Sequence, residues 1–195
     1  MKIVLASANQ GKLNELAGLL APLGIEVESQ AAFGITPAPE ERSTFVENAL
    51  DKARHVARQS GLPALADDSG LVVPALGGAP GIRSARYAGA DGNDAANNAK
   101  LIAALADVDA PRAHFYCALV FLRHPEDPAP IVATARWHGE ILAAPRGQAG
   151  FGYDPLFYLP ELQRTAAELE PAEKNRRSHR GRAMALLLEQ LRLEL

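Results

Sequence analysis

The feature that most constrains the fold is the alternation of short apolar runs with longer segments whose apolar residues recur at helical spacing. Residues 3–6 have the pattern of a buried strand, and after a polar, glycine-containing loop the apolar positions recur at helical spacing from 13 to 23. Residues 44–61 repeat the helical pattern, starting with a hydroxyl three positions before a glutamate and ending at a glycine. This alternation predicts an α/β sheet with flanking helices.

Two long strand candidates follow in the second half of the chain, at residues 115–122 and 131–141. The proline-rich linker at residues 125–130 joins them, which predicts an antiparallel hairpin. Together with the alternation, this predicts an α/β or mixed sheet. Residues 178–193 form a strong amphipathic helix pattern. No linker is evident, which predicts a single domain over residues 1–195.

Composition excludes several classes of protein. The 195 residues can bury about 70% of the unfolded surface without a disulfide or structural metal. A net charge of −3, with 23 acids against 20 bases, argues against a protein that coats nucleic acid. The longest apolar run is far too short for a membrane span, and the single cysteine excludes a disulfide framework. The start lacks a signal-peptide pattern, so we expect a cytosolic protein.

The first loop is the best candidate for an anion site. It joins a strand to a helix start through a glycine, which turns free backbone N–H groups toward a ligand. Lys12 lies in the first turn of that helix, where a cation opposes the dipole; a bound phosphate explains it, and so does plain exposure to solvent. It is not a Walker loop, because Ala6 replaces the first glycine and Leu13 the final hydroxyl residue.

Two acidic pairs could hold a metal. Asp67 and Asp68 end a predicted strand, so their side chains should point to opposite faces. Glu40 and Glu41 lie in a loop that could reach the same site. Carboxylates beside phosphates typically hold Mg²⁺. The alternative is that these residues are ordinary turn acids and a solvated charge pair.

Two further segments could bind a nucleotide. Residues 173–182 place five bases and one histidine near a predicted helix start, which indicates either a bound anion or a solvated basic face. Residues 150–155 set glycines around an aromatic side chain, which leaves room for a flat ligand to stack. The alternative for the second segment is a core aromatic residue in a tight turn.

Other polar residues do not form a recognisable site in the sequence. Four histidines lack zinc-binding spacing: His55, His114, His124 and His138. Lys52 is predicted on the exposed face of a helix, whereas Cys117 and Trp137 are expected in the core. Ser69 lacks the glycine elbow of a serine hydrolase.

Taken together, seven segments in order resemble the inosine/xanthosine triphosphate pyrophosphatase family over nearly the whole chain. The motifs are Ser7-x-Asn9-x-x-Lys12, Thr44-Phe45-x-Glu47-Asn48-Ala49, Ala66-Asp67-Asp68-Ser69-Gly70-Leu71, Gly78-Ala79-Pro80-Gly81, Ser84-Ala85-Arg86-Tyr87, Gly150-Phe151-Gly152-Tyr153-Asp154-Pro155, and Glu173-Lys174 followed by Ser178-His179-Arg180-Gly181. The chain has Glu41-Arg42-Ser43 before Thr44, where family members often have Glu-Thr-Gly.

The resemblance implies an α/β fold of two lobes with a long mixed sheet, a central cleft, and assembly as a homodimer. It implies Mg²⁺-dependent hydrolysis of dITP, ITP and XTP to a monophosphate and pyrophosphate. The main alternatives are a binding protein without turnover and a relative that acts on modified pyrimidines; in the latter an Arg stands where Lys12 lies.

The resemblance also assigns roles to residues. Asp68 is the expected catalytic base and, with Glu40 by its spacing from Phe45, a metal ligand. The expected phosphate contacts are Ser7, Ala8, Asn9, Gln10, Gly11, Lys12 and Ser69. The expected base contacts are Phe151, Gly152, Tyr153, Asp154, His179 and Arg180, whereas Lys174 could reach either phosphate or base.

Overall fold

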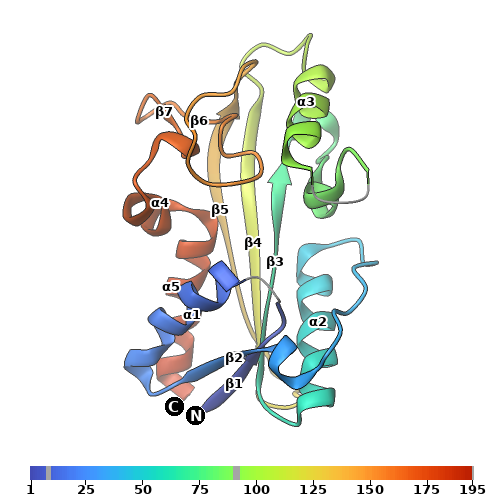
Figure 1. The fold of residues 1–195 in the computed structure, drawn as a ribbon, viewed down its shortest axis with the longest axis vertical. Helices are drawn as coiled ribbons and strands as arrows, with labels where there is room; N and C mark the ends of the chain where they lie inside the picture. The colour runs from blue at the N-terminus through green and yellow to red at the C-terminus, as the bar shows by residue number, and fades with distance from the viewer. Residues whose placement is uncertain (8–9, 90–92, 195) are drawn as a thin grey trace. The chain divides into compact units, whose positions relative to one another are not determined.

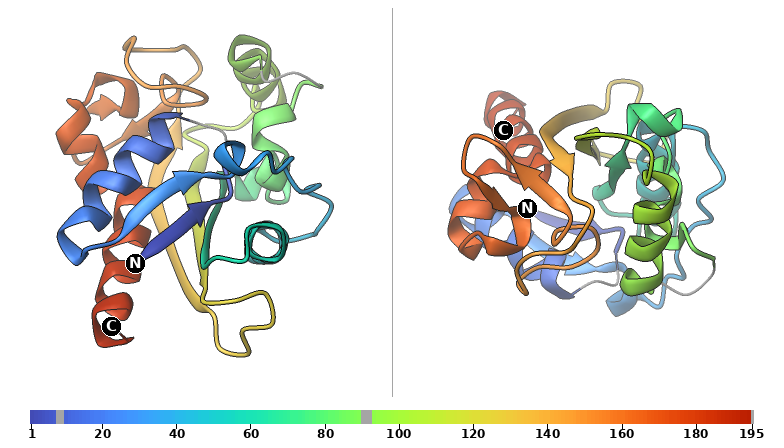
Figure 2. Two further views of the ribbon diagram at one scale, coloured as in Figure 1. Left: turned by 60° about the horizontal axis from the view of Figure 1, so that its bottom comes forward. Right: turned by 90° about the horizontal axis from the view of Figure 1, so that it is seen from above.

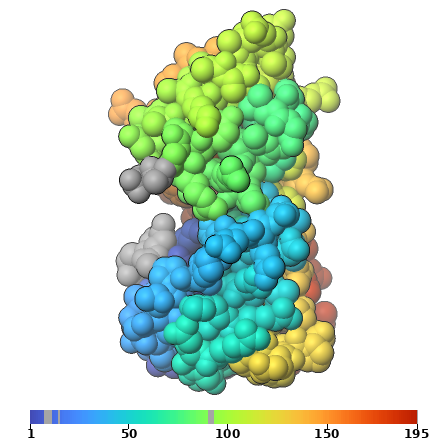
Figure 3. All heavy atoms as spheres, turned by 90° about the vertical axis from the view of Figure 1, so that its right-hand side faces the viewer, coloured from blue at the N-terminus to red at the C-terminus, as the bar shows by residue number. Residues whose placement is uncertain are grey.

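A computed structural model describes residues 1–7, 10–89 and 93–194 (Figure 1). The chain divides into two compact units. Unit 1 comprises Met1–Asp68, Ala118–Thr134 and Ala183–Leu195, and unit 2 comprises Ser69–Cys117 and Ala135–Arg182. In Figure 3 the blue and cyan atoms, from the first part of the chain, belong to unit 1, and the green atoms, from around residue 100, belong to unit 2. The expectation that residues 1–195 act as one catalytic domain with a cleft stays a prediction.

Within the described residues, seven strands form one sheet in the order β2-β1-β3-β4-β5-β6-β7. They are β1 Lys2–Leu5, β2 Glu26–Ser29, β3 Ala64–Val72, β4 Arg112–Leu122, β5 Ile131–Ile141, β6 Phe157–Leu159 and β7 Arg164–Thr165. Strand β1 is parallel to β2 and β3, whereas β5, β6 and β7 pair antiparallel. The expected mixed sheet with flanking helices is therefore confirmed.

In unit 1 the helices follow signals visible in the sequence. Helix α2, Phe45–Ser60, begins where the Thr44 hydroxyl accepts a hydrogen bond from the Glu47 N–H at 3.2 Å, and it ends at Gly61 with φ of +69°. Helix α1, Gln10–Leu20, lies on the other side of β1 and β2 from α2 (Figures 1 and 2). Helix α5, His179–Glu194, starts in unit 2 and continues into unit 1.

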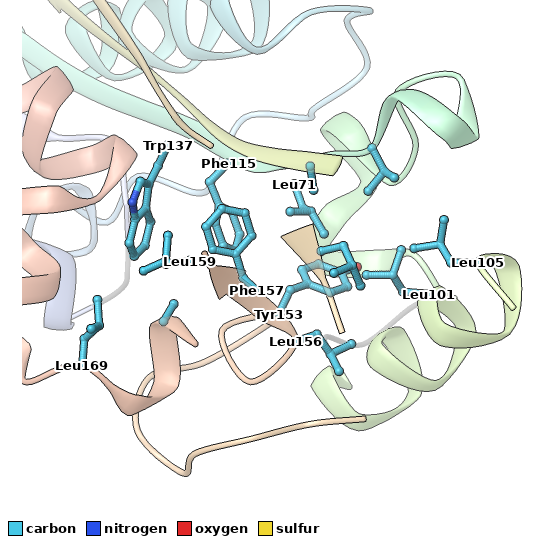
Figure 4. Packing of buried hydrophobic residues seen from close by; sticks show 14 residues of the cluster. Leu71, Leu101, Leu105, Phe115, Trp137, Tyr153, Leu156, Phe157, Leu159 and Leu169 are labelled. Atoms are coloured by element: carbon cyan, nitrogen blue, oxygen red, sulfur yellow. The ribbon is translucent and has the colours of Figure 1, made fainter. Parts of the chain in front are cut away.

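Unit 2 has a large aromatic core (Figure 4). Phe157 lies 4.6 Å from Phe115 and 5.2 Å from Trp137 between ring centres. Trp137 is 2% exposed and Cys117 is fully buried, as expected. The described helices of this unit are α3 Asp94–Ala104, α4 Pro171–Arg177 and the start of α5. Short 3₁₀ turns occur in both units, at Ala21–Leu23, Gln30–Phe33, Pro74–Leu76, Gly81–Arg86 and Ala166–Glu168. Among the described residues, no helix is long and apolar enough to cross a membrane.

Two sequence expectations are corrected. Strand β3 does not end at Asp67 but continues to Val72, because both acidic side chains find partners within the fold. The basic run does not crowd one helix start: Lys174, Arg176 and Arg177 lie in the last turn of α4, where cations favour the dipole.

Candidate active site

Two adjacent acidic residues in the middle of β3 interact with different helices. Asp67, 4% exposed, pairs with Lys12 of α1, whereas Asp68, 8% exposed, is bound by Asn48 and Lys52 of α2. Their side chains therefore point to opposite faces of the strand, as the alternation rule predicts. Because each carboxylate has a positively charged partner on its own side of the strand, β3 can hold two adjacent buried charges.

Lys52 is the centre of the Asp68 cluster. Its ammonium donates to Asp68 Oδ1 at 2.9 Å, to Glu40 Oε1 at 2.7 Å and to the Asp67 carbonyl at 3.0 Å. The Lys52 side chain is only 13% exposed. The prediction that it lies on the exposed helix face was wrong, because its long stem brings the charge back to the strand.

Asn48 fixes the geometry of this cluster from one turn earlier on α2. Its Nδ2 donates to Asp68 Oδ2 at 3.2 Å, and its Oδ1 accepts from the Arg42 N–H at 3.0 Å. The second bond fastens the loop that carries Glu40, while Glu41 is exposed. Asn48 lies within the Thr-Phe-x-Glu-Asn motif, and Lys52 four residues later shares its helix face; that spacing was the signal available in the sequence.

The electrostatics of the cluster favour a proton-accepting carboxylate. Burial raises the pKa of Asp68 above its usual value, although the Lys52 ammonium opposes the shift. Burial by itself lowers the pKa of Lys52, but the carboxylates of Asp68 and Glu40 outweigh it and raise that pKa. The lysine therefore remains charged and partly compensates two carboxylates.

The first loop is only partly described. Ala8 and Asn9 lie outside the described residues, and α1 begins at Gln10 followed by Gly11. Ser7 accepts a hydrogen bond from the Ser29 hydroxyl at its carbonyl, at 2.9 Å. Lys12 forms an ion pair with buried Asp67, so its position at a helix start is offset by a carboxylate and is not simple exposure to solvent.

In unit 2, an exposed aromatic ring stands on a tightly held loop. Phe151 is 62% exposed, and the Lys174 ammonium lies 5.1 Å from its ring centre. Asp154, 4% exposed, accepts from the Phe151 N–H at 2.9 Å and pairs with Lys174. Gly150 has φ of +82°, and a Cβ there would collide with the Asp154 carboxylate, so the turn requires glycine.

The next residues anchor this loop to the rest of unit 2. The Gly152 N–H donates to Asp94 Oδ2 at 2.7 Å, and its carbonyl accepts from Asn98 at 3.0 Å. The Tyr153 hydroxyl donates to the Ser84 carbonyl at 2.8 Å, and the residue is 4% exposed. The Tyr153 ring is therefore part of the core, and the Asp154 carboxylate holds the loop.

His179 and Arg180 lie at the start of α5. The His179 ring stacks on Phe115 with ring centres 4.8 Å apart and planes 12° from parallel. Arg180 Nη2 donates to the Ser69 hydroxyl at 3.3 Å. At Gly181 an added Cβ would overlap the Asn175 carbonyl, so glycine allows α4 and α5 to meet closely.

Comparisons with known proteins decide the family. Residues 3–190 match the Ham1 family. The chain belongs to the Ham1 family. It is 58% identical over 190 residues to the dITP/XTP pyrophosphatase of Nitrosomonas europaea, covering 97% of this chain and 94% of that protein. It is 60% identical over 190 residues to the protein of that name from Aromatoleum aromaticum, covering 97% and 96%.

Solved Ham1 structures share the whole fold. The HAM1 protein from Coxiella burnetii is 50% identical, with a TM-score of 0.95 and complete coverage of both chains. The Staphylococcus aureus Ham1 protein is 39% identical, with a TM-score of 0.92 and complete coverage of both. The family resemblance predicted from the seven motifs is confirmed.

The cluster of Asp68, Glu40 and Lys52 contains oxygen ligands that suit a hard cation. Among the described residues, no three acidic, histidine or cysteine side chains gather in a metal-binding group. Two carboxylates, from Asp68 and Glu40, nevertheless converge on one positive charge, the Lys52 ammonium. Oxygen donors of this kind are those that Mg²⁺ prefers, so the residues fit that ion.

Proposed function

We propose that this protein hydrolyses unusual purine nucleoside triphosphates, namely dITP, ITP and XTP, to a monophosphate and pyrophosphate. The observation that carries the proposal is the convergence of Asp68 and Glu40 on Lys52, in a chain 58–60% identical to proteins named dITP/XTP pyrophosphatases. A protein that only binds nucleotides does not need a buried carboxylate with a raised pKa.

The reaction consumes one water molecule. The water oxygen bonds to the α-phosphorus while the bond from that phosphorus to the bridging oxygen of the β-phosphate breaks, and pyrophosphate leaves with the bond electrons. Asp68 accepts a proton from the attacking water, and its raised pKa makes it a better base than an ordinary carboxylate. Such transfers require mainly positioning and charge stabilisation, so no nucleophilic side chain is needed.

Positive charge near the phosphates comes from this chain's lysines and from a metal. Asp68 and Glu40 are the proposed ligands of Mg²⁺, which when bound offsets negative charge on the phosphates. Lys12 and Lys52 contribute their ammonium groups. The segment from Ser7 to Lys12, with Ser69, is proposed to contact the phosphates through hydroxyl and backbone groups.

The loop of unit 2 is proposed to hold the base. Exposed Phe151 offers a face for stacking, and Gly152 leaves room beside it. Lys174 lies over the same ring, which favours a role at the base rather than at the phosphates. Arg180 donates hydrogen bonds and cannot accept them, so it suits the 6-keto oxygen of hypoxanthine or xanthine. His179, stacked on Phe115, is proposed beside it.

Compartment and assembly are inferred from the same resemblance. We propose that the protein acts in the cytosol, where free nucleotides are used for synthesis, and that it assembles as a homodimer. Its substrate is a free nucleotide, and neither nucleic acid nor membrane is part of the proposal. Light scattering coupled to size-exclusion chromatography tests the dimer.

The test of the activity is release of pyrophosphate from ITP, XTP, ATP and GTP, with and without Mg²⁺. We expect rapid release from ITP and XTP with the metal, and little from ATP or GTP. Binding of ITP without release of pyrophosphate would support the nucleotide-binding alternative instead.

A further inference from the structure

Strands β4 and β5 are neighbours whose register can be derived from one hydrogen bond. The Ile141 N–H donates to the Pro111 carbonyl at 2.9 Å. In an antiparallel pair, residue numbers directly across the strands then have a constant sum, which places His114 opposite His138. Counting from that bonded pair, the histidines occupy a non-hydrogen-bonded position, where facing side chains approach most closely.

The two histidines lie on the side of the hairpin away from the aromatic core. Side chains alternate along a strand, and the neighbours Phe115 and Trp137 point into the core of unit 2. His138 is exposed and His114 is half-buried. Neither residue takes part in the proposed hydrolysis, so the close approach of the two histidine rings has to be explained by something else.

The spacing of the rings suits a shared metal. With metal–nitrogen bonds of about 2.0–2.1 Å and a further ~1.1 Å from nitrogen to ring centre, two imidazoles on a tetrahedral ion have ring centres about 5.2 Å apart. The observed separation is 5.3 Å, with the planes tilted by 37°. Stacked imidazoles would lie closer to parallel.

The surroundings of His138 provide open space and side chains of both charge signs, with two acids and two arginines near the pair. A hollow of about 320 Å³ adjoins His138 and is also lined by the acidic residues Glu140 and Glu161 and by the basic residue Arg112. It gives solvent access to the pair on the side of His138. Arg136, on the other side of the pair, lies over the Tyr116 ring at 5.4 Å.

We propose that His114 and His138 form a binding site for a transition-metal ion of the zinc class. Imidazole nitrogens favour Zn²⁺, Ni²⁺ and Cu²⁺, whereas Mg²⁺ prefers oxygen ligands. The site is therefore distinct in chemistry from the carboxylate cluster, and it bridges the two longest strands across their exposed side.

The test is a titration of the full chain with Zn²⁺ in excess Mg²⁺, which is added to compete for the proposed carboxylate site. In NMR spectra of the wild-type protein, we expect the ring protons of His114 and His138 to shift together with one dissociation constant. Calorimetry is expected to give one Zn²⁺ per chain at this site. His114→Gln and His138→Gln should each weaken binding by about tenfold or more, since each removes one of two ligands.

The matched control is His124→Gln, which removes an exposed histidine outside the pair and should leave Zn²⁺ binding unchanged. The double variant should bind Zn²⁺ at least as weakly as either single variant, because it retains neither imidazole ligand. Different dissociation constants for the two rings would overturn the proposal. So would retained affinity in a folded single variant, checked by circular dichroism.

Discussion

The carboxylate cluster of unit 1 and the aromatic loop of unit 2 use opposite means to prepare a binding surface. Asp68 and Lys52 are held by a strand and a helix, are nearly buried, and compensate each other's charge. Phe151 is exposed on a loop whose neighbours, Gly152 and Asp154, are fastened by hydrogen bonds. The electrostatic interactions of the cluster are thus strengthened by burial. The ring of the loop, in contrast, stays exposed, and only the backbone that carries it is fixed by hydrogen bonds.

This contrast has measurable consequences. Removing a charge from the cluster should change turnover and stability together, because the remaining partners are left buried without compensation. Removing the exposed ring should change substrate binding alone, because few contacts within the fold depend on it. The following four substitutions test that separation.

The largest effect is expected for Asp68→Asn. The amide keeps the size of the side chain but cannot accept the proton, so turnover of ITP should fall by about 10²-fold or more. Pyrophosphate release gives the rate, and circular dichroism checks the fold. Exposed Asp107→Asn is the control and should keep full activity. Near-normal turnover in folded Asp68→Asn would remove this residue from the mechanism.

Lys52→Met should lower both turnover and stability. Without the ammonium, two neighbouring carboxylates lose their shared donor, which should cost about 1–3 kcal/mol of unfolding free energy. Because Lys52 holds the pKa of Asp68 down, its removal should move the acid limb of the pH–rate profile to higher pH. Turnover at neutral pH should fall about tenfold or more.

Urea unfolding and a pH series of pyrophosphate release measure both effects of Lys52→Met. The control is Lys100→Met in unit 2, whose ammonium lies over the Tyr87 ring and which should keep the wild-type pH profile. An unchanged acid limb in Lys52→Met, with the fold intact, would contradict the assigned coupling between Lys52 and Asp68.

Arg180→Ala should reduce selectivity for the base. A guanidinium aimed at position 6 pairs with the keto oxygen of hypoxanthine but faces the amino group of adenine donor to donor, a difference of roughly 1–3 kcal/mol. The ratio of kcat/KM for ITP over ATP should therefore shrink by about tenfold or more. Equal losses for both substrates would place Arg180 at the phosphates instead.

The smallest effect is expected for Phe151→Ala. Loss of stacking on an exposed ring should raise KM for ITP about fivefold, at the lower end of base–aromatic stacking energies. The melting temperature should stay unchanged, because the ring is mostly exposed. Exposed Leu193→Ala, far along the chain in α5, is the control for KM. A large fall in melting temperature would mean that Phe151 supports the fold and so erase the contrast between the two regions.

Local signals allowed much of the fold to be predicted from the sequence. The cap at Thr44, the stop at Gly61 and the opposite faces of Asp67 and Asp68 all depend on residues close in the chain, and all were confirmed. The prediction for Lys52 was wrong because helical periodicity indicates only the face of the helix from which a side chain starts. It does not indicate where the long aliphatic part of a lysine places its ammonium group.

Features that depend on tertiary pairing could not be read in the same way. The separation of His114 from His138 by 24 positions matches no zinc motif, and only the register of two strands places them opposite. The environment of Lys12 was missed for the same reason. The prediction considered only the helix dipole, whereas the ammonium pairs with the buried Asp67 carboxylate 55 residues away. Its ion pair implies that Lys12→Ala destabilises the free protein, whereas the dipole alone predicts a slight gain.

The ammonium of Lys52 also acts as a tethered counter-ion. Carboxylates gathered to bind a divalent ion ordinarily repel one another when that ion leaves, so many such sites loosen or unfold on chelation. Here a cation that cannot diffuse away remains between Asp68 and Glu40. If Asp68 and Glu40 hold Mg²⁺ as proposed, the fold of unit 1 should therefore not depend on the metal, and chelation should abolish activity without lowering the melting temperature.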